Sequence, residues 1–328
     1  MDSRTRLLET LRFSPKVPPP RYESEFSDEV VAAWRQQGVL GDESPEARLQ
    51  LDTWDALPVE WRRNDEEKQI VHDEAELRDF MRAYDPQRAD RLPPDWPDRV
   101  TACRTRESAI AIEPWNEGFF QVLGIRNGAT LTEALTLLCE RPDLAEAQMA
   151  HYADYVVGLI DRVLADADID FAVFYEPIAS NHGPVISPAT YRRFVTPALG
   201  RVSECLDRHG VAFRLIWSAG RVEPLIPEWL DAGVNGFLLN RSAECGMPYT
   251  RLRREFGPSA RFLGGIDWRP VVEGSPALER ELEQNVRPLL EQGGYVPHLD
   301  DTVRVYMPFD RFRYYREQLD ALVAQVFG

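Results

Sequence analysis

The chain has 328 residues, 44% of them hydrophobic, and a formal net charge of −16. This hydrophobic content is enough for a full core. The acidic excess argues against binding to nucleic acid, whose phosphate backbone needs a basic surface, and gives no reason to expect an anionic membrane as a partner.

Cysteine usage and the first segment indicate the compartment. The four cysteines are widely spaced and form no C-x-x-C pair, so we expect neither a disulfide framework nor a structural zinc site. The segment MDSRTRLLETLRF carries charges throughout and lacks the apolar core of a secretory signal. Since no run approaches about 18 apolar residues, no membrane span is expected, and we predict a cytoplasmic protein.

The first hundred residues predict a short helix, a strand, a second helix and an insertion. The first helix is expected at residues 2–12, and the prolines of VPPPRYESEF at 17–26 hold an extended segment that is the predicted first strand. A helix follows from Ser27, whose side chain suits an N-cap. Residues 41–100 are rich in charge and proline and predict a β-hairpin and loop insertion. Its weak strand signals lie at Trp54 to Val59 and Lys68 to His72.

From residue 109 onward, apolar runs alternate with helical patterns. A strand is expected at Ala109 to Glu113, and two helices at 131–139 and 142–165. Five further apolar runs each end on polar residues and are separated by helical patterns. They lie at residues 171–176, 213–218, 236–240, 261–267 and 295–301. This alternation predicts a parallel sheet whose strands all end on one side, as in a (β/α)8 barrel.

The polar residues at these five strand ends are the predicted site. They are Glu176, Ser218, Asn240, Asp267, and the group His298, Asp300 and Asp301. Ser218 also suits the N-cap of the next helix, which is an alternative explanation for it. Repeated units of strand, polar end and helix are how a barrel presents a site at its carboxyl end, and we therefore expect the side chains of Glu176, Asp267 and Asp300 to converge there.

For other segments, the sequence allows a structural role as well as a functional one. The loop at 177–187, PIASNHGPVIS, is long enough for a lid, and His182 within it is a candidate substrate contact. The following helix is expected to stop at His209 and Gly210, where a histidine favours the negative end of the helix dipole. His209 is therefore expected to be structural, and Cys205, on the apolar stripe of that helix, to be a core residue.

Several segments resemble the uroporphyrinogen decarboxylase superfamily. They are SPATYRRFVTPALGRV, LIPEWLDAGVNGFLLN, LRREFGPSARFLGGIDWRPVVEG and GGYVPHLDDTVRVYMPFDRFRYYRE, with SRTRLLETLRF and VPPPRYE at the start. That superfamily includes uroporphyrinogen decarboxylase and the methyltransferases of corrinoid-dependent methyl transfer. The resemblance implies a single (β/α)8 TIM-barrel domain over residues 1–328, often assembled as a homodimer.

The same comparison shows departures at the site positions. Where the decarboxylases have an arginine-bearing segment resembling R-Q-A-G-R-Y, this chain has RYESEFSDE, whose Glu23 and Glu25 would repel a polycarboxylate. Where the zinc methyltransferases have H-x-C, it has Trp217-Ser218-Ala219, and where they have a further cysteine it has His298 to Asp301. The resemblance therefore implies neither uroporphyrinogen as substrate nor the zinc site of the methyltransferases.

The remaining groups suit carboxylate chemistry. Carboxylates crowded at one barrel mouth raise one another's pKa, so one of Glu176, Asp267, Asp300 and Asp301 could hold a proton while another stays ionised. Asp267, which follows two glycines, is the predicted central acid or base. Candidate substrate contacts are Arg221 for a carboxylate, with Ser218, Asn240 and His182, and Tyr175 and Trp268 as aromatic walls.

Alternatives remain open for the metal and for the activity. His298 and Asp300 lie two apart on a strand and could chelate one divalent metal ion, although no cofactor is required by the carboxylate mechanism. The predicted function is a decarboxylase-like lyase acting on a small molecule that carries a carboxylate. The first alternative is a methyltransferase with a non-zinc metal or none, working with a corrinoid protein partner. The second is a non-catalytic protein that binds a small molecule.

Overall fold

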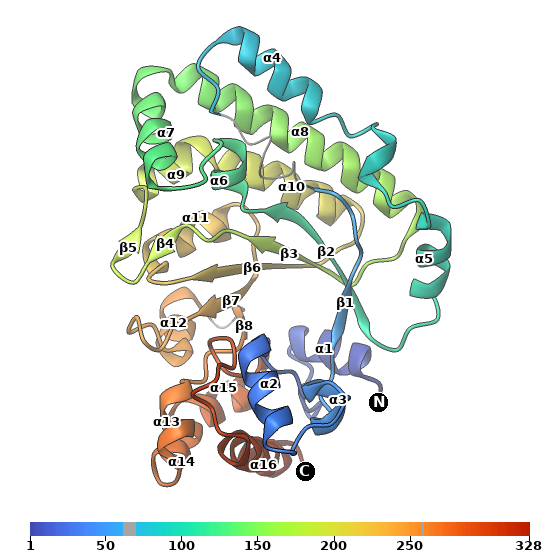
Figure 1. Ribbon diagram of the computed structural model, residues 1–328, viewed down its shortest axis with the longest axis vertical. Helices are drawn as coiled ribbons and strands as arrows, with labels where there is room; N and C mark the ends of the chain where they lie inside the picture. Colours follow the sequence, from blue (N-terminus) through green and yellow to red (C-terminus); the bar gives the residue numbers. More distant parts are fainter. Residues whose placement is uncertain (62–69, 258) are drawn as a thin grey trace.

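A computed structural model describes residues 1–61, 70–257 and 259–328. In this part of the chain, seven parallel strands form one curled sheet in the order β1-β2-β3-β6-β7-β8-β9 (Figure 1). These strands are β1 (Trp54–Ala56), β2 (Ala109–Asn116), β3 (Phe171–Tyr175), β6 (Phe213–Ala219), β7 (Gly236–Asn240), β8 (Arg261–Leu263) and β9 (Tyr295–Val296). The short strands β4 (Ala179–Ser180) and β5 (Gly183–Pro184) form a separate antiparallel pair.

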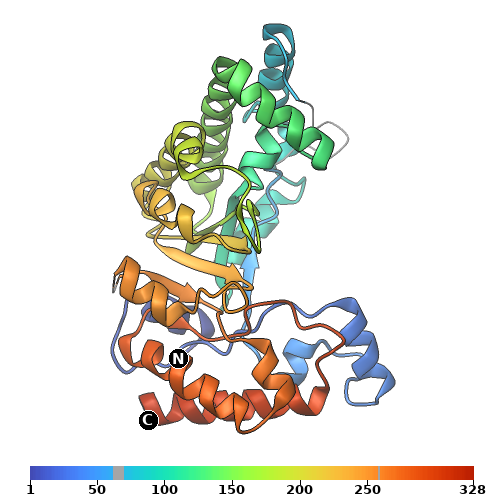
Figure 2. The same cartoon turned by 90° about the vertical axis from the view of Figure 1, so that its left-hand side faces the viewer.

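Helices follow the strands and cover the sheet (Figures 1 and 2). The α-helices before β6 are α1 (Ser3–Leu11), α2 (Asp28–Gln36), α3 (Pro45–Leu49), α4 (Glu74–Ala83), α5 (Trp96–Cys103), α6 (Gly118–Val122), α7 (Gly128–Glu140), α8 (Pro142–Asp166), α9 (Pro188–Phe194) and α10 (Thr196–Arg208). The later ones are α11 (Ile226–Asp231), α12 (Tyr249–Phe256), α13 (Trp268–Glu273), α14 (Ala277–Glu281), α15 (Arg287–Gln292) and α16 (Phe309–Phe327). No helix of the described residues is both long enough and apolar enough to cross a bilayer.

The two faces of the sheet belong to two separate apolar clusters, because successive side chains of a strand point to opposite faces. The inner face contributes Ala109, Ala111, Phe171, Val173, Phe213, Leu215, Leu238, Leu263 and Val296. Leu7 and Leu11 of α1 join this inner cluster. The outer face contributes Ile110, Ile112, Ala172, Phe174, Ile216, Phe237, Leu239, Phe262 and Tyr295 to the larger cluster under the helices. A shift of one residue along a strand therefore moves a side chain from one cluster to the other.

The two ends of the chain pack together beside the sheet. Trp34 of α2 lies against Phe309 and Phe312 of α16, with ring centroids 5.1 and 5.5 Å apart. Phe26 also contacts Phe312, at 5.4 Å. In both views the blue N-terminal helix α2 and the red C-terminal helix α16 lie at the same end of the molecule. Residues 275 to 286 positions apart in the sequence thus share one aromatic cluster.

An extended segment links the two edge strands. The Asp52 N–H donates to the Arg21 carbonyl (3.1 Å), and the Val303 N–H donates to the Glu25 carbonyl (2.7 Å). Phe26 forms a parallel bridge with Val303. The prediction of a first strand at 17–26 is wrong, because Phe26 alone among these residues forms a β-bridge. The segment nevertheless lies between the residues before β1 and those after β9.

The expected helices at 2–12, 131–139 and 142–165 are confirmed, as are the six strand positions from Ala109 onward and the N-cap at Ser27. The predicted β-hairpin in residues 41–100 is wrong. Trp54–Ala56 pairs in parallel with β2, and Ile70 to His72 form no strand; Lys68 and Gln69 lie outside the described residues. The regular structure in this segment is mostly helical: Asp73 caps α4, and residues 77, 80, 81 and 84 form an apolar stripe that the many charges obscure.

Candidate functional site

A cleft of about 530 Å³ lies at the carboxyl ends of the central strands. Its lining residues come from the ends of β6 and β7 and from the segments after β7, β8 and β9. They are Trp217, Ala219, Asn240, Arg241, Glu244, Trp268, Asp301, Thr302, Arg304 and Tyr306. Of the predicted strand-end residues, Asn240 and Asp301 line this cleft, as does Trp268, which was predicted as an aromatic wall.

Aromatic rings form part of the wall. The rings of Trp268 and Tyr306 lie 4.3 Å apart and are tilted by 37°. Trp217 packs in turn against Tyr175, with centroids 5.5 Å apart. Both belong to the inner face, where they cover the apolar cluster below. The cleft therefore has a hydrophobic floor and an aromatic side.

Paired charges also line the cleft. The Arg241 guanidinium donates to both oxygens of Glu244, at 2.7 and 2.9 Å. Arg304 lies 3.7 Å from Asp301. The hairpin β4–β5 reaches this wall through Asn181, whose amide donates to Glu244 (3.2 Å). The lining thus offers two cations and two carboxylates, which suits a ligand that carries both signs of charge.

Asp300 lies beneath this wall and is 3% exposed. Its Oδ2 accepts a hydrogen bond from the Ala243 N–H (3.0 Å), and its carbonyl accepts one from the Arg241 N–H (2.7 Å). Burial raises the pKa of Asp300 from its ordinary value of 3.8 to about 7. The hydrogen bond from the Ala243 N–H opposes this rise, whereas the carboxylates of Asp267 and Asp301 add to it. Asp300 can therefore both hold and release a proton near neutral pH.

Asp267, the predicted central acid or base, is a helix cap. Its Oδ1 accepts a hydrogen bond from the Arg269 N–H (3.0 Å), and its Oδ2 lies 2.7 Å from the Arg269 guanidinium. Both carboxylate oxygens are thus occupied at the start of α13.

His298 is buried and makes a local hydrogen bond. Its Nδ1 lies 2.8 Å from the Leu299 carbonyl, which can only accept, so Nδ1 carries the hydrogen. Burial lowers the pKa of His298, although Glu23 opposes this effect. The imidazole also fills the space beside Gly264, where an added Cβ would lie 2.9 Å from its Cε1. In the described ranges, the one group of three potential metal ligands within reach of one another lies elsewhere and contains neither His298 nor Asp300.

Residues 124–317 match the family model described as uroporphyrinogen decarboxylase (URO-D). The chain belongs to the URO-D family. Among solved structures, a methyltransferase from Methanosarcina mazei has the same fold, with a TM-score of 0.63 over 100% of both chains and 14% sequence identity. No curated protein matches the sequence.

Glu176 does not share the cleft of this URO-D protein. It follows the inward-facing Tyr175 and therefore points to the outer face, where it is fully buried. Its carboxylate accepts hydrogen bonds from the Trp115 indole N–H (2.7 Å), the Phe119 N–H (3.2 Å) and the Tyr191 hydroxyl (3.4 Å). The predicted convergence of Glu176 with Asp267 and Asp300 is therefore wrong for Glu176, although all three follow the carboxyl ends of strands.

Ser218, like Glu176, lies on the outer face, because successive side chains of a strand point to opposite faces. It is buried next to the inward-facing Trp217, and its hydroxyl donates to the Glu176 carbonyl (2.6 Å). It is neither a cleft residue nor the N-cap of the next helix, since α11 has Leu225 in that place. Its hydrogen bond instead ties the end of β6 to the end of β3.

The remaining predicted contacts lie on the rim. The side chains of Arg221 and His182 are exposed. The Arg221 N–H donates to the Ser180 carbonyl (2.8 Å), and the His182 N–H donates to the Ser180 hydroxyl (3.2 Å). The loop at 177–187 and the start of the segment after β6 therefore lie together beside the cleft.

The sequence analysis predicted three of the ten lining residues and missed the other seven, which are Trp217, Ala219, Arg241, Glu244, Thr302, Arg304 and Tyr306. The alternation of side chains along β6 could have found Trp217 and Ala219, because they share the face of Phe213 and Leu215. The other five lie on irregular segments after β7 and β9, and no periodicity marks them.

The zinc site of related methyltransferases does not fit this mouth. At the position of their H-x-C motif, Trp217 is an apolar wall and Ser218 faces the helices. His298, the imidazole that was considered as a metal ligand, bonds to a backbone carbonyl. We therefore derive no step through zinc at the cleft.

Proposed function

We propose that this protein is an enzyme that binds a small molecule in the cleft and cleaves one of its bonds with Asp300 as the general acid. The observation that carries this proposal is the buried Asp300 carboxyl, whose pKa is about 7, directly behind the wall of the cleft. General acids work best when their pKa lies near the operating pH. Membership of the URO-D family supports an enzyme rather than a binding protein without catalysis.

The proposed reaction is methyl transfer. In such a step the bond between the methyl carbon and nitrogen or oxygen breaks, its electron pair stays on the leaving atom, and Asp300 gives that atom a proton. The methyl group passes to a nucleophilic acceptor, for which we propose the reduced corrinoid of a partner protein. The shared fold with the methyltransferase from Methanosarcina mazei supports this class over the alternatives.

The cleft suits a substrate with both a methylated cation or ether and a carboxylate. Trp217, Trp268 and Tyr306 offer aromatic faces to which a methylated ammonium group binds well. Arg241 and Arg304 can exchange their present carboxylate partners for a substrate carboxylate. Glu244 and Asp301 then remain to balance the cationic end.

Decarboxylation is the second candidate. The same two arginines would orient a carboxylate, carbon dioxide would leave with its bond electrons remaining on carbon, and Asp300 would protonate that carbon. The proton-holding Asp300 beside two arginines favours this candidate specifically. Both candidates use Asp300 and the two arginines in the same cleft, so the product distinguishes them.

For the molecule as a whole, we propose a (β/α)8 barrel over residues 1–328 that the segment at 17–26 closes between β1 and β9, in one domain. We further propose a cytoplasmic protein that can form a homodimer. Backbone hydrogen bonds on both sides of the segment support the closure.

The test uses the full chain and panels of small methylated amines and methoxy compounds, with and without a carboxylate. Reduced cobalamin serves as the acceptor, and its conversion to methylcobalamin is followed by absorbance; release of carbon dioxide is measured in parallel. We expect methyl transfer with a zwitterionic or carboxylate-bearing donor. Release of carbon dioxide without methyl transfer would replace the first candidate by the second.

Paired variants then test the role of Asp300. Asp300→Asn should lower the rate by about 10²- to 10⁴-fold, whereas Asp267→Asn, which keeps a capping side chain, should have a much smaller effect. Equal losses in the two variants, or full activity in Asp300→Asn, would contradict the proposed acid.

A further inference from the structure

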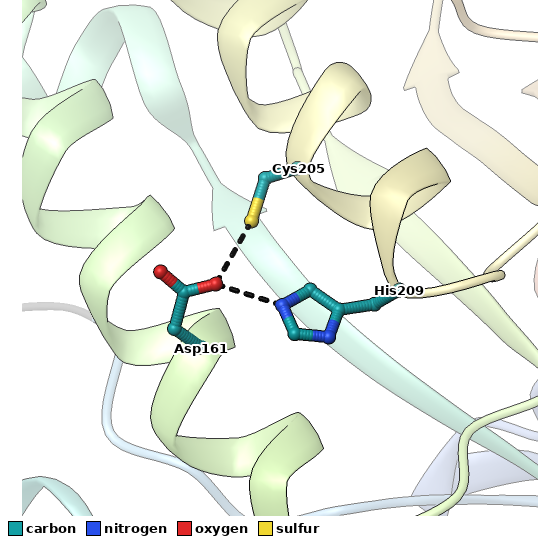
Figure 3. Close-up of side chains that lie close together, drawn as sticks. All are labelled: Asp161, Cys205 and His209. Carbon is teal, nitrogen blue, oxygen red and sulfur yellow. Dashed lines mark hydrogen bonds and ion pairs between the residues drawn. The ribbon is translucent and has the colours of Figure 1, made fainter.

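Three potential metal ligands meet on the outer helical layer (Figure 3). Asp161 lies on α8, Cys205 on α10, and His209 directly after the end of α10. Cys205 and His209 are four positions apart and therefore lie on one face of their helix, toward α8. The ligand atoms of the three side chains all lie within 4.8 Å of one another.

We propose that Asp161, Cys205 and His209 bind one zinc ion, with the fourth coordination position open to water. Zinc accepts sulfur, nitrogen and carboxylate ligands at about 2.0 to 2.3 Å, which places neighbouring tetrahedral ligand atoms about 3.3 to 3.8 Å apart. Asp161 Oδ1 lies 3.6 Å from Cys205 Sγ and 2.7 Å from His209 Nε2. Small side-chain rotations are enough to reach the tetrahedral spacing.

The present hydrogen bonds show what the ion would replace. Asp161 Oδ1 accepts from both Cys205 and His209, so two protons lie where one ion would sit. Because the Cys205 thiol donates to Asp161, it carries its proton until a metal displaces that proton. Metal binding should therefore release protons.

The choice of ligands also determines which metal fits. A thiolate, an imidazole and a carboxylate together select zinc or a similar borderline ion over magnesium and calcium, which prefer oxygen alone. Because the site joins α8 to the end of α10, the bound ion would hold these two helices together. This role is structural and does not depend on the reaction proposed for the cleft.

The test uses the full chain, stripped of metal with a chelator and titrated with zinc by calorimetry. Cobalt is used as a spectroscopic substitute, since a cysteine ligand produces a thiolate-to-cobalt charge-transfer band. We expect one ion per chain, proton release, the charge-transfer band, and a rise in Tm of at least about 2 °C under excess zinc.

Variants assign the ion to these ligands. His209→Ala, at a partly exposed position, and Cys205→Ser should each weaken binding by more than about 100-fold, because loss of outer-shell partners alone costs about 10- to 100-fold. Two controls should leave binding unchanged: Cys139→Ser removes an exposed thiol, and His72→Ala removes a surface histidine paired with two carboxylates. The proposal fails if wild type shows no saturable binding at micromolar zinc, or if a control variant loses as much affinity as His209→Ala.

Discussion

Replacing Glu176 by Gln should change how the stability of the protein depends on pH. Burial raises the pKa of Glu176 from its ordinary value of 4.5 to about 7, against the effect of three hydrogen-bond donors. Between these two values the folded state holds a proton that the unfolded state has released, so this group lowers stability as pH rises from about 4.5 to about 7. Above that range the loss is complete and constant.

The size of the effect follows from the two pKa values. Each tenfold difference in proton affinity is worth about 1.4 kcal/mol, so the full loss is about 3 kcal/mol, of which about 2 to 3 kcal/mol falls between pH 5 and pH 8.5. Gln cannot ionise and removes this dependence. It also turns an amide toward one of the donors from Trp115, Phe119 and Tyr191, which costs about 1 to 3 kcal/mol at every pH.

Urea unfolding at several pH values measures the free energy of unfolding, and tryptophan fluorescence can follow it because the chain has eight tryptophans. The free energy of unfolding of wild type minus that of Glu176→Gln should fall by about 2 to 3 kcal/mol from pH 5 to pH 8.5. The contribution of Asp300 cancels in this difference because the variant retains it. Glu146→Gln, at an exposed ion pair with Arg193, should show no such trend. A difference for Glu176→Gln that stays constant within about 0.5 kcal/mol would refute the reasoning.

Three further predictions concern the site and the core. If Asp300 is the acid, the rate should decline as pH rises through about 7, and this limb of the pH profile should vanish in Asp300→Asn. Arg316→Met should lower the free energy of unfolding by about 3 to 5 kcal/mol, because it leaves Glu23 buried without its partner at 3.2 Å. Adding Glu23→Gln to this variant should recover part of the lost stability, and a double variant without any recovery would contradict the pairing. The purified protein should not convert uroporphyrinogen at about 1 per second or faster, because Arg21 of RYESEFSDE is hydrogen-bonded to Asp320. Turnover to coproporphyrinogen at such a rate would overturn this prediction.

The sequence alone determined the order of strands and helices from Ala109 onward. Apolar runs of strand length, separated by amphipathic patterns, are local features, and a parallel sheet places all their carboxyl ends on one side. That reasoning placed Asn240, Trp268 and Asp301 at one mouth, where the structure has them. The family was indicated separately, by the resemblance of sequence motifs, four of which lie within residues 124–317 that the family model covers.

In residues 41–100 the apolar patterns that predict helices and strands were weaker than those from Ala109 onward. Charges on α4 hid its apolar stripe, and the partner of Trp54–Ala56 is β2, more than 50 positions away. Whether a short extended segment forms a hairpin or joins the main sheet depends on such a distant partner, which no local pattern contains.

Only the tertiary structure decided which polar residues face the cleft and which protonation states they favour. Tyr175 and Glu176 are neighbours in sequence, yet one faces the inner cluster and the other lies under the helices. Asp267 and Asp300 both follow strands, yet one pairs with Arg269 at the start of a helix and the other is buried beneath the segment after β7. Burial and the nearest charges control the pKa of a carboxyl, and both are supplied by segments far apart in the chain.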